Sequence, residues 1–152
     1  MADILIRPTE TGDAALLAAN LRACDREELQ AVGYWDALAP IADSVRTSAL
    51  CWTALADGEL ACILGVAPLD GQTGAPWMLG TPLLDTQARV LVRETPRYIG
   101  AMLEVFPHLL NFVHAQNRTS VHWLRRLGFT LHDAVPYGSQ GALFHPFEMR
   151  AR

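Results

Sequence analysis

The chain has 152 residues, 51% of them hydrophobic and 18% charged, and a formal net charge of −4 at pH 7. Such a chain buries one core, so we expect a single domain over residues 1–152, and the acidic balance excludes a surface that tracks nucleic-acid phosphates. No apolar run reaches the roughly 18 residues of a membrane span, and residues 1–7 lack the pattern of a signal peptide. These features predict a cytoplasmic protein.

The first part of the chain is predicted to be a strand followed by three helices. Residues 4–7 are β-prone, and Pro8 closes them as an edge-tolerant strand. Asp13 is a candidate N-cap for a first helix. Residues 25–30 and 36–47 carry the spacing of two further helices.

Residues 49–66 form the clearest hairpin. Two apolar, β-rich runs over residues 49–56 and 59–66 flank the dipeptide Asp57-Gly58. That dipeptide is typical of a two-residue type I′ turn, in which both residues have positive φ. We therefore expect two antiparallel strands joined at this point.

The three cysteines do not form a CxxC pair. With a regular two-residue turn, Cys62 faces Thr53 and Cys51 faces Leu64. The two strand cysteines are then only diagonal neighbours, too far apart for good disulfide geometry. We expect Cys24, like the other two, to be a reduced, buried, structural thiol.

The rest of the chain is predicted to alternate between strands and helices. Strands are expected over residues 75–80, 109–114, 129–135 and 142–149. A long helical region runs over residues 91–106, and Pro96 must end, kink or restart it. A second helix covers residues 118–127, and Gly128 suits its C′ position.

The order of these elements predicts the fold class. It runs β, two or three helices, β-β-β, α, β, α, β-β, with no internal repeat and no linker. Helices inserted between mostly antiparallel strands indicate a mixed α/β domain. We expect a sheet of about seven strands, flanked by helices.

Residues 117–129, with the sequence NRTSVHWLRRLGF, resemble a known segment of the GNAT acyltransferases. The segment is an Asn followed by a helix with a small residue, apolar residues, a basic pair and a closing Gly-Phe. Ile6, Arg7 and Pro8 resemble the usual first strand of that family. With the element order, the resemblance covers nearly the whole chain. It implies a GNAT fold whose sheet splays between strands 4 and 5, and an acetyl-CoA-dependent N-acyltransferase.

A narrower resemblance is to small GNAT-like proteins of tailed phages and prophages, including internal virion and morphogenesis proteins. It implies an alternative function, a catalytically inactive virion or assembly protein that binds other phage proteins. The virion is then a second location beside the host cytoplasm. The residues that carry it lie at 77–81, 92–94, 109–111, 117–129, Gly141, Phe144 and Phe147.

The resemblance also implies where acetyl-CoA lies. In GNAT enzymes the strand-four backbone pairs with the pantetheine arm, and a glycine-containing loop receives the pyrophosphate. On this chain the cofactor-binding residues are then Leu79, Gly80, Thr81 and Asn117, although a helix N-cap alone explains an Asn at the last position. Residues 81–93 contain no glycine. The pyrophosphate loop is therefore expected to be degenerate.

Three residues are catalytic candidates. The position at which the resemblance implies a tyrosine acid holds Leu124 here. His114 ends the fifth strand, where a base meets an amine substrate. Tyr137 lies in the last turn and is placed to replace the missing tyrosine. Glu28, with its neighbour Glu27, falls where GNAT helices frame the acceptor site. A structural histidine, a turn tyrosine and a solvated helix face explain the same residues without catalysis.

No metal site is expected, because the histidines are not grouped with cysteines or carboxylates at ligand spacing. A third function keeps the cleft and exchanges the ligand for another small molecule. The sequence leaves open whether the acceptor amine belongs to a small molecule or to a protein. It also leaves the oligomeric state open.

Overall fold

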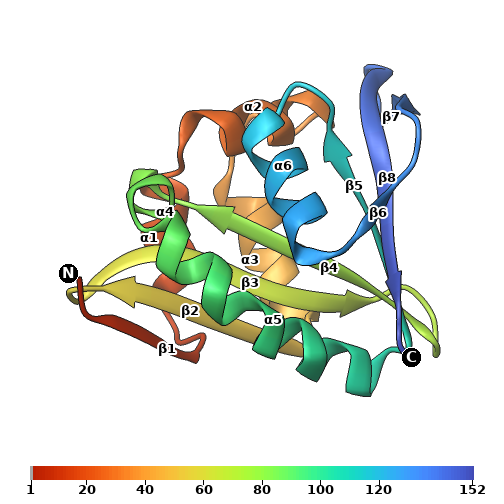
Figure 1. The fold of residues 1–152 in the computed structure, drawn as a ribbon. Helices are drawn as coiled ribbons and strands as arrows, with labels where there is room; N and C mark the ends of the chain where they lie inside the picture. Colours follow the sequence, from red (N-terminus) through yellow and green to blue (C-terminus); the bar gives the residue numbers. More distant parts are fainter. Residues whose placement is uncertain (1) are drawn as a thin grey trace.

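The computed structural model describes residues 2–152, which build an eight-stranded mixed sheet with helices on both faces (Figure 1). The strand order is β1-β2-β3-β4-β5-β8-β6, and β7 pairs with β8 beside this path. The strands are β1 (Ile4–Pro8), β2 (Leu50–Ala56), β3 (Glu59–Pro68), β4 (Thr73–Gly80), β5 (His108–His114), β6 (Thr130–Leu131), β7 (Val135–Tyr137) and β8 (Ala142–Arg150).

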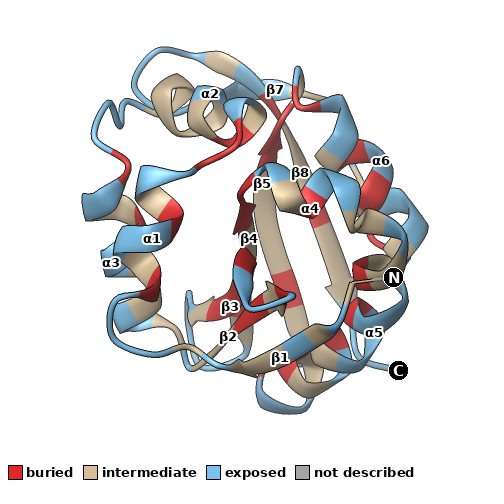
Figure 2. Ribbon diagram, turned by 90° about the vertical axis from the view of Figure 1, so that its left-hand side faces the viewer, coloured by how far each residue is buried: buried red, intermediate tan, exposed pale blue. Residues whose placement is uncertain are grey.

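The helices lie in two groups on opposite faces of the sheet (Figure 2). The helices α1 and α3 share one hydrophobic cluster with β3 and β4, while α5 and α6 share another on the opposite face. None of the helices within residues 2–152 combines the length and the apolar character that crossing a membrane requires. The bounds are α1 (Asp13–Ala19), α2 (Ala23–Ala31), α3 (Leu38–Thr47), α4 (Pro82–Thr86), α5 (Ala88–Val105) and α6 (Arg118–Leu127).

Strand β3 lies at the centre of the core and is buried on both of its faces. Ile63 belongs to the cluster on the α1–α3 side, while Leu64 and Val66 belong to the cluster on the α5–α6 side. The sequence of a strand covered on both faces is continuously apolar, whereas a strand with one exposed face alternates between apolar and polar residues. This explains the sequence ELACILGVAP of β3.

The hairpin of β2 and β3 confirms the predicted turn but not the predicted pairing. Asp57 and Gly58 have φ values of 49° and 81°, as a type I′ turn requires. A β-bulge near the turn adds one residue on the β3 side. Cys62 therefore faces Ala54, and the prediction that it faces Thr53 was wrong by one residue.

The bulge also changes the partner of Cys51, and the three thiols differ in how deeply they are buried. Cys51 faces Gly65 rather than Leu64. All three thiols are free, as predicted, but only Cys62 is fully buried, while Cys24 and Cys51 are half-buried. Burial raises the pKa of Cys62 to about 12 and that of Cys24 to about 11, so both are protonated at neutral pH.

Asp13 starts the first helix in a different way from the prediction. Gly12 occupies the N-cap position, and Asp13 is the first helical residue. The Asp13 carboxylate is buried, where it accepts hydrogen bonds from Arg7 Nη1 and Thr53 Oγ1, both at 2.8 Å. Its side chain therefore ties α1 to β1 and β2 instead of capping the helix.

Pro96 lies inside α5, which continues through it as one helix of 18 residues. The sequence predicted that Pro96 would end, kink or restart the helix. The helix neither ends nor restarts at Pro96. Pro96 is exposed, and its missing N–H leaves the Val92 carbonyl without the usual helical donor. The neighbouring Thr95 is buried and donates its hydroxyl to Leu91 O at 2.6 Å within the same helix.

The predicted strand over residues 129–135 is divided in two. The short β6 and β7 both pair with β8, at different points along it. A short helix, α4, precedes α5 in a region where no separate helix was predicted. The remaining elements, and the mixed sheet that they form, agree with the predicted fold class.

The parallel pair of β4 and β5 stays together only at its start. The ladder comprises Thr73 with His108 and Gly74 with Leu109, and from there the strands diverge (Figure 1). A side chain at Gly74 would collide with Phe106, so the contact at this end depends on glycine. The predicted splay between the fourth and fifth strands is thus present.

Candidate functional site

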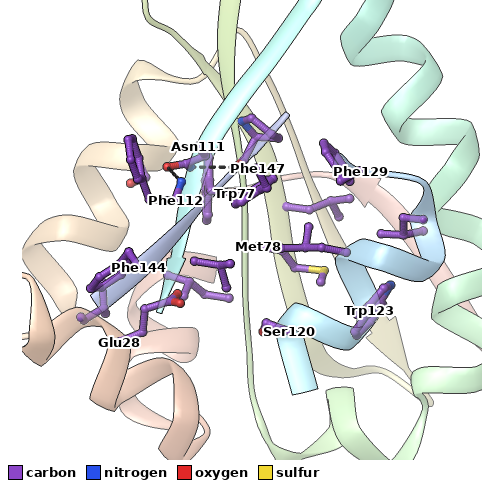
Figure 3. Close-up of a pocket in the computed structure, with 18 of the residues that line it drawn as sticks. Glu28, Trp77, Met78, Asn111, Phe112, Ser120, Trp123, Phe129, Phe144 and Phe147 are labelled. Atoms are coloured by element: carbon purple, nitrogen blue, oxygen red, sulfur yellow. Dashed lines mark hydrogen bonds between the residues drawn. The ribbon is translucent and has the colours of Figure 1, made fainter. Parts of the chain in front are cut away.

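A cavity of about 540 Å³ lies in the splay between β4 and β5 and is lined by residues from both faces of the sheet (Figure 3). We call its part on the α1–α3 side the front lobe, which includes Glu28, Tyr34, Trp77, Phe112, Tyr137 and Phe144. The back lobe, on the α5–α6 side, includes Met78, Thr95, Ile99, Ser120, Trp123 and Leu124. Both lobes are mainly apolar, which suits a small organic ligand.

The backbone of β4 offers one free donor to this cavity. Thr81 N–H donates to Ala61 O at 3.0 Å and so faces β3. Backbone groups alternate in direction along a strand, so Gly80 and Met78 face the splay. Gly80 N–H is bound to Asp25 Oδ2 at 2.8 Å, whereas no side chain within residues 2–152 binds the Met78 N–H.

The facing groups of β5 are bound by side chains. Phe112 N–H donates to Asn111 Oδ1 at 2.8 Å. His114 N–H donates to Glu28 Oε1 at 2.7 Å. Met78 is consequently the one splay-facing residue of β4 whose N–H remains available to a ligand among the described residues.

Glu28 is the acidic group of the front lobe. Helix α2 directs its carboxylate against the end of β5, where it meets the His114 N–H. Burial raises the pKa of Glu28 to about 7, and the nearby charge of Asp25 acts in the same direction. A carboxylate with this pKa takes up a proton readily at neutral pH, which is the property of a general base.

The other two catalytic candidates differ in their access to the cavity. Tyr137 lines the front lobe, with its ring stacked on Phe112 at a centroid distance of 4.2 Å. The His114 ring is buried beside Phe144 and does not line the cavity. Burial lowers the pKa of His114. Glu28 and Tyr137 thus line the same cavity, and His114 contacts Glu28 only through its backbone N–H.

Asn117 is the N-cap of α6, the alternative that the sequence left open. Its Oδ1 accepts the Ser120 N–H at 3.3 Å, and its Nδ2 lies 3.5 Å from Asp25 Oδ1. Asn117 is buried and does not line the cavity. Its predicted contact with coenzyme A remains a prediction.

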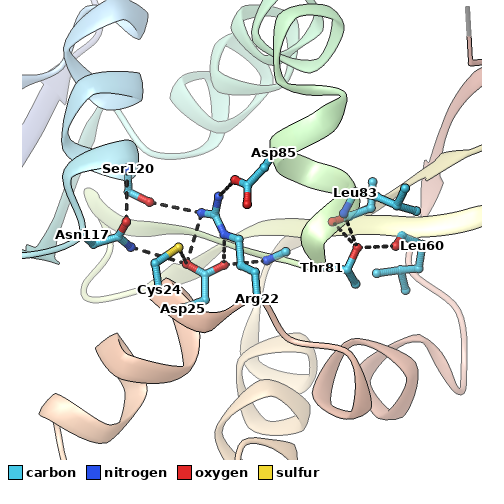
Figure 4. A network of polar contacts seen from close by, with 11 residues as sticks. Arg22, Cys24, Asp25, Leu60, Thr81, Leu83, Asp85, Asn117 and Ser120 are labelled. Carbon is cyan, nitrogen blue, oxygen red and sulfur yellow. Dashed lines mark hydrogen bonds and ion pairs between the residues drawn. The ribbon is translucent and has the colours of Figure 1, made fainter.

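A buried ion pair spans the open end of the splay (Figure 4). Arg22 Nε binds Asp25 Oδ2 at 2.7 Å, and the two side chains are 3% and 1% exposed. Arg22 Nη1 binds Asp85 of α4 at 2.8 Å, and Nη2 reaches Ser120 of α6 at 3.3 Å. With the bond from Gly80 to Asp25, this network joins α2 to β4, α4 and α6.

Sequence reasoning missed this network. Arg22 and Asp25 are three residues apart and resemble any exposed charge pair on a helix. Their burial follows from contacts with Gly80, Asp85 and Ser120, which lie far along the chain. The sequence signal that was available was the apolar surrounding of this pair, Leu21, Ala23 and Cys24.

The segment after β4 is helical and offers few groups to a phosphate. Thr81 caps α4 with its own hydroxyl, which accepts Leu83 N–H at 3.3 Å. Leu84 packs directly on Gly80, where a Cβ would collide with it. Asp85 brings a carboxylate to the same turn. The predicted loss of the glycine loop therefore has a structural counterpart, a capped helical turn with an acidic residue.

A metal centre has no support in the geometry. Within the described part of the chain, residues 2–152, no three or more His, Cys, Asp or Glu side chains gather as a metal ion would require.

The sequence matches no family model and no curated protein. Its structure does match solved structures. An acetyltransferase from Streptococcus agalactiae superposes with a TM-score of 0.74 at 13% identity, covering 97% of this chain and 98% of that chain. The ribosomal alpha-N-protein acetyltransferase RimL, in complex with coenzyme A, gives 0.72 at 11% identity, with 97% and 94% covered.

The chain has the GNAT fold. Spermidine N-acetyltransferase from Vibrio cholerae, in complex with coenzyme A and spermine, also superposes on it, with a TM-score of 0.69 at 14% identity over 97% of this chain and 95% of that chain. At such identities the likeness establishes the fold alone. The resemblance to phage proteins remains a prediction from the sequence.

Proposed function

We propose that this GNAT-fold protein is an N-acyltransferase that works at the cavity in the splay, with Glu28 as its general base. The observation that carries the proposal is the Glu28 carboxylate, whose pKa of about 7 sets it apart in a cavity that passes through the sheet. The fold supports it, because RimL and the Vibrio cholerae enzyme are acetyltransferases in complex with coenzyme A.

The residues of the site fit one end of acetyl-CoA and not the other. The apolar back lobe and the free N–H of Met78 suit a thioester on an extended arm. The turn at residues 81–87 does not suit a pyrophosphate, because the Thr81 hydroxyl already caps it and the Arg22 guanidinium beside it is already paired with Asp25 and Asp85. The chain is therefore proposed to hold its donor by the arm rather than by the phosphates.

Bound acetyl-CoA supplies an acyl carbon whose C–S bond breaks as the C–N bond to the amine forms. Glu28 removes the proton that the amine loses. The Met78 N–H donates to the acyl oxygen as negative charge develops there. Leu124 has no proton to give, so Tyr137, a hydroxyl-bearing residue of the front lobe, is assigned to protonate the departing thiolate.

A comparison of two donors tests the proposal. Acetyl-CoA and acetyl-pantetheine, which lacks the nucleotide, are offered with a panel of primary amines, and thiol release and amide formation are followed. We expect both donors to react, with kcat/KM values within about tenfold of each other, and Glu28→Gln to slow the reaction with both by about 10²–10⁴-fold.

The opposite outcomes are equally clear. A donor preference of about a thousandfold for acetyl-CoA would show that the phosphates are bound after all. Absence of amide formation and of binding with both donors would refute the proposal. That result would favour the inactive assembly protein, which Leu124 and the acidic turn at Asp85 also suit.

A further inference from the structure

We infer that the front lobe selects a primary amine attached to an aromatic or apolar group. This rests on the proposed function for the acyl transfer itself, but recognition of the amine is a separate property and is tested separately. The inference draws on the aromatic lining of the front lobe and its single carboxylate (Figure 3), and on the contact between two loops beside it.

Aromatic rings form much of the front lobe. The stacked rings of Phe112 and Tyr137 continue to Phe144, whose centroid lies 5.2 Å from that of Tyr137. Trp77 and Tyr34 line the same lobe. Aromatic faces attract both an ammonium group and another flat ring. A lobe of this kind therefore offers contacts to the apolar part of an amine as well as to its ammonium group.

Trp77 is held so that its face, and not its polar edge, is available. Its Nε1–H donates to Ser48 Oγ at 2.8 Å, outside the cavity. A side chain at Gly65 would lie 3.0 Å from the same Nε1, so the edge of the indole is closely surrounded. The indole thus contributes an oriented aromatic surface and no hydrogen-bond donor.

One carboxylate matches one positive charge. Glu28 is the only carboxylate among the described residues that line the cavity, and none of them is Lys or Arg. Leu29 and Val32 of α2 add apolar surface next to it. An amine with several charges would have to bury the others without a partner, which is costly. A monoamine with an apolar body fits this charge balance.

Two loops contact each other beside the front lobe. Gly33, after α2, lies against Ser139, where a Cβ would be 2.8 Å from Oγ. Gly138, which lines the lobe, lies against Val32 in the same way, with a Cβ 3.2 Å from the Val32 Cα. This contact leaves no open groove there for an extended peptide.

Binding without a donor tests the inference on the full chain. Phenethylamine, its neutral analogue phenethyl alcohol, and spermidine are titrated by calorimetry, with ligand-observed NMR as a second readout. We expect phenethylamine to bind at least about tenfold more tightly than either of the others. Phe112→Leu should weaken phenethylamine binding about tenfold. The matched control is Tyr98→Leu, which should leave this affinity unchanged, because the Tyr98 ring packs against Trp52 outside the cavity.

The outcomes separate this inference from the proposed function. Equal or tighter binding of spermidine, or acyl transfer to spermidine and not to phenethylamine, overturns the inference and leaves the acyltransferase intact. Selective phenethylamine binding without any acyl transfer supports the inference and overturns the proposed function. Absence of binding by all three ligands overturns the inference. If Phe112→Leu does not fold, the selectivity of the unaltered protein decides alone.

Discussion

The Asn111 side chain donates to the Pro76 carbonyl oxygen at 2.8 Å and so joins β5 to β4 beyond the end of their backbone ladder. The same amide accepts the Phe112 N–H through Oδ1 at 2.8 Å. Asn111 therefore satisfies one splay-facing group on each strand. It sets the separation of the two strands beside the cavity that they enclose.

Replacing Asn111 by Leu should destabilise the protein by about 1–3 kcal/mol, because the Phe112 N–H and the Pro76 carbonyl lose their partner. Urea unfolding measures the loss, and faster hydrogen exchange of the Phe112 amide locates it. The control is Asn20→Leu, which removes an exposed bond to Leu16 O and should cost less than about 0.5 kcal/mol. Equal costs would contradict the role of Asn111 in the splay.

Glu28→Gln should make the protein more stable at alkaline pH. The folded pKa of about 7 lies above the ordinary value of 4.5, so the folded protein binds this proton more tightly than the unfolded chain does. Stability is therefore lost as the pH rises from the lower value to the higher, by about 3 kcal/mol in total. Glutamine removes the ionisation and still accepts the His114 N–H.

The comparison is made by urea unfolding at about pH 4 and about pH 8, on either side of both pKa values. The variant should equal the parent at the lower pH and exceed it by about 2–3 kcal/mol at the higher. Glu27→Gln, on the exposed face of the same helix, is the matched control and should change neither value. A variant that is no more stable than the parent at alkaline pH would place the Glu28 pKa near its ordinary value.

The same carboxyl should set the pH dependence of acyl transfer. A base with a pKa of about 7 is active when ionised, so kcat/KM should rise with pH and level off above that value. Glu28→Gln should lose this inflection together with about 10²–10⁴-fold of the rate. A profile with the same inflection in the variant would assign the titration to another group.

The buried pair of Arg22 and Asp25 should be the most sensitive polar contact of the fold. Arg22→Met leaves the Asp25 charge buried without its partner and should cost about 3–5 kcal/mol. Arg46→Met, which breaks the exposed ion pair with Asp43, should cost less than about 0.5 kcal/mol. Urea midpoints compare the two. Adding Asp25→Asn to Arg22→Met should recover part of the loss, and no recovery would mean that packing dominates.

Local sequence signals predicted the parts of the fold that local chemistry determines. The Asp57-Gly58 turn needs only two residues that tolerate positive φ, and it formed as expected. Gly128 likewise ends α6, as the sequence predicted, and its φ of 97° lies in the left-handed region that glycine tolerates. The resemblance carried by residues 117–129 then led to the fold class, which the structure confirms.

Features that depend on contacts across the chain were not predictable in this way. The β-bulge on β3, opposite Ala54 and Leu55, shifts the pairing of β2 and β3 without any glycine or proline to signal it. The exposed-looking Glu28 acquires its raised pKa from burial beside β5, which is 80 residues or more away in the chain. Position in the GNAT frame suggested Glu28 as a base, but its surroundings give it the pKa of one.

Gly138→Ala tests the contact between the two loops over the front lobe. Gly138 has a φ of 76°, and an added methyl group would also meet the Val32 backbone at 3.2 Å. Gly141 shares the positive φ, at 66°, but faces open space. Both alanine variants should lose about 1 kcal/mol to backbone strain, and Gly138→Ala should lose about 1 kcal/mol more by pressing the loops apart.

The additional cost should appear in function as well as in stability. Moving Gly138 away from Val32 opens the front lobe, so the KM for the amine should rise several-fold in Gly138→Ala and stay unchanged in Gly141→Ala. Steady-state kinetics with one amine and a saturating donor separates KM from kcat. Equal stability and equal KM in the two variants would mean that the loops yield freely, because only Gly138 has a neighbour that must move.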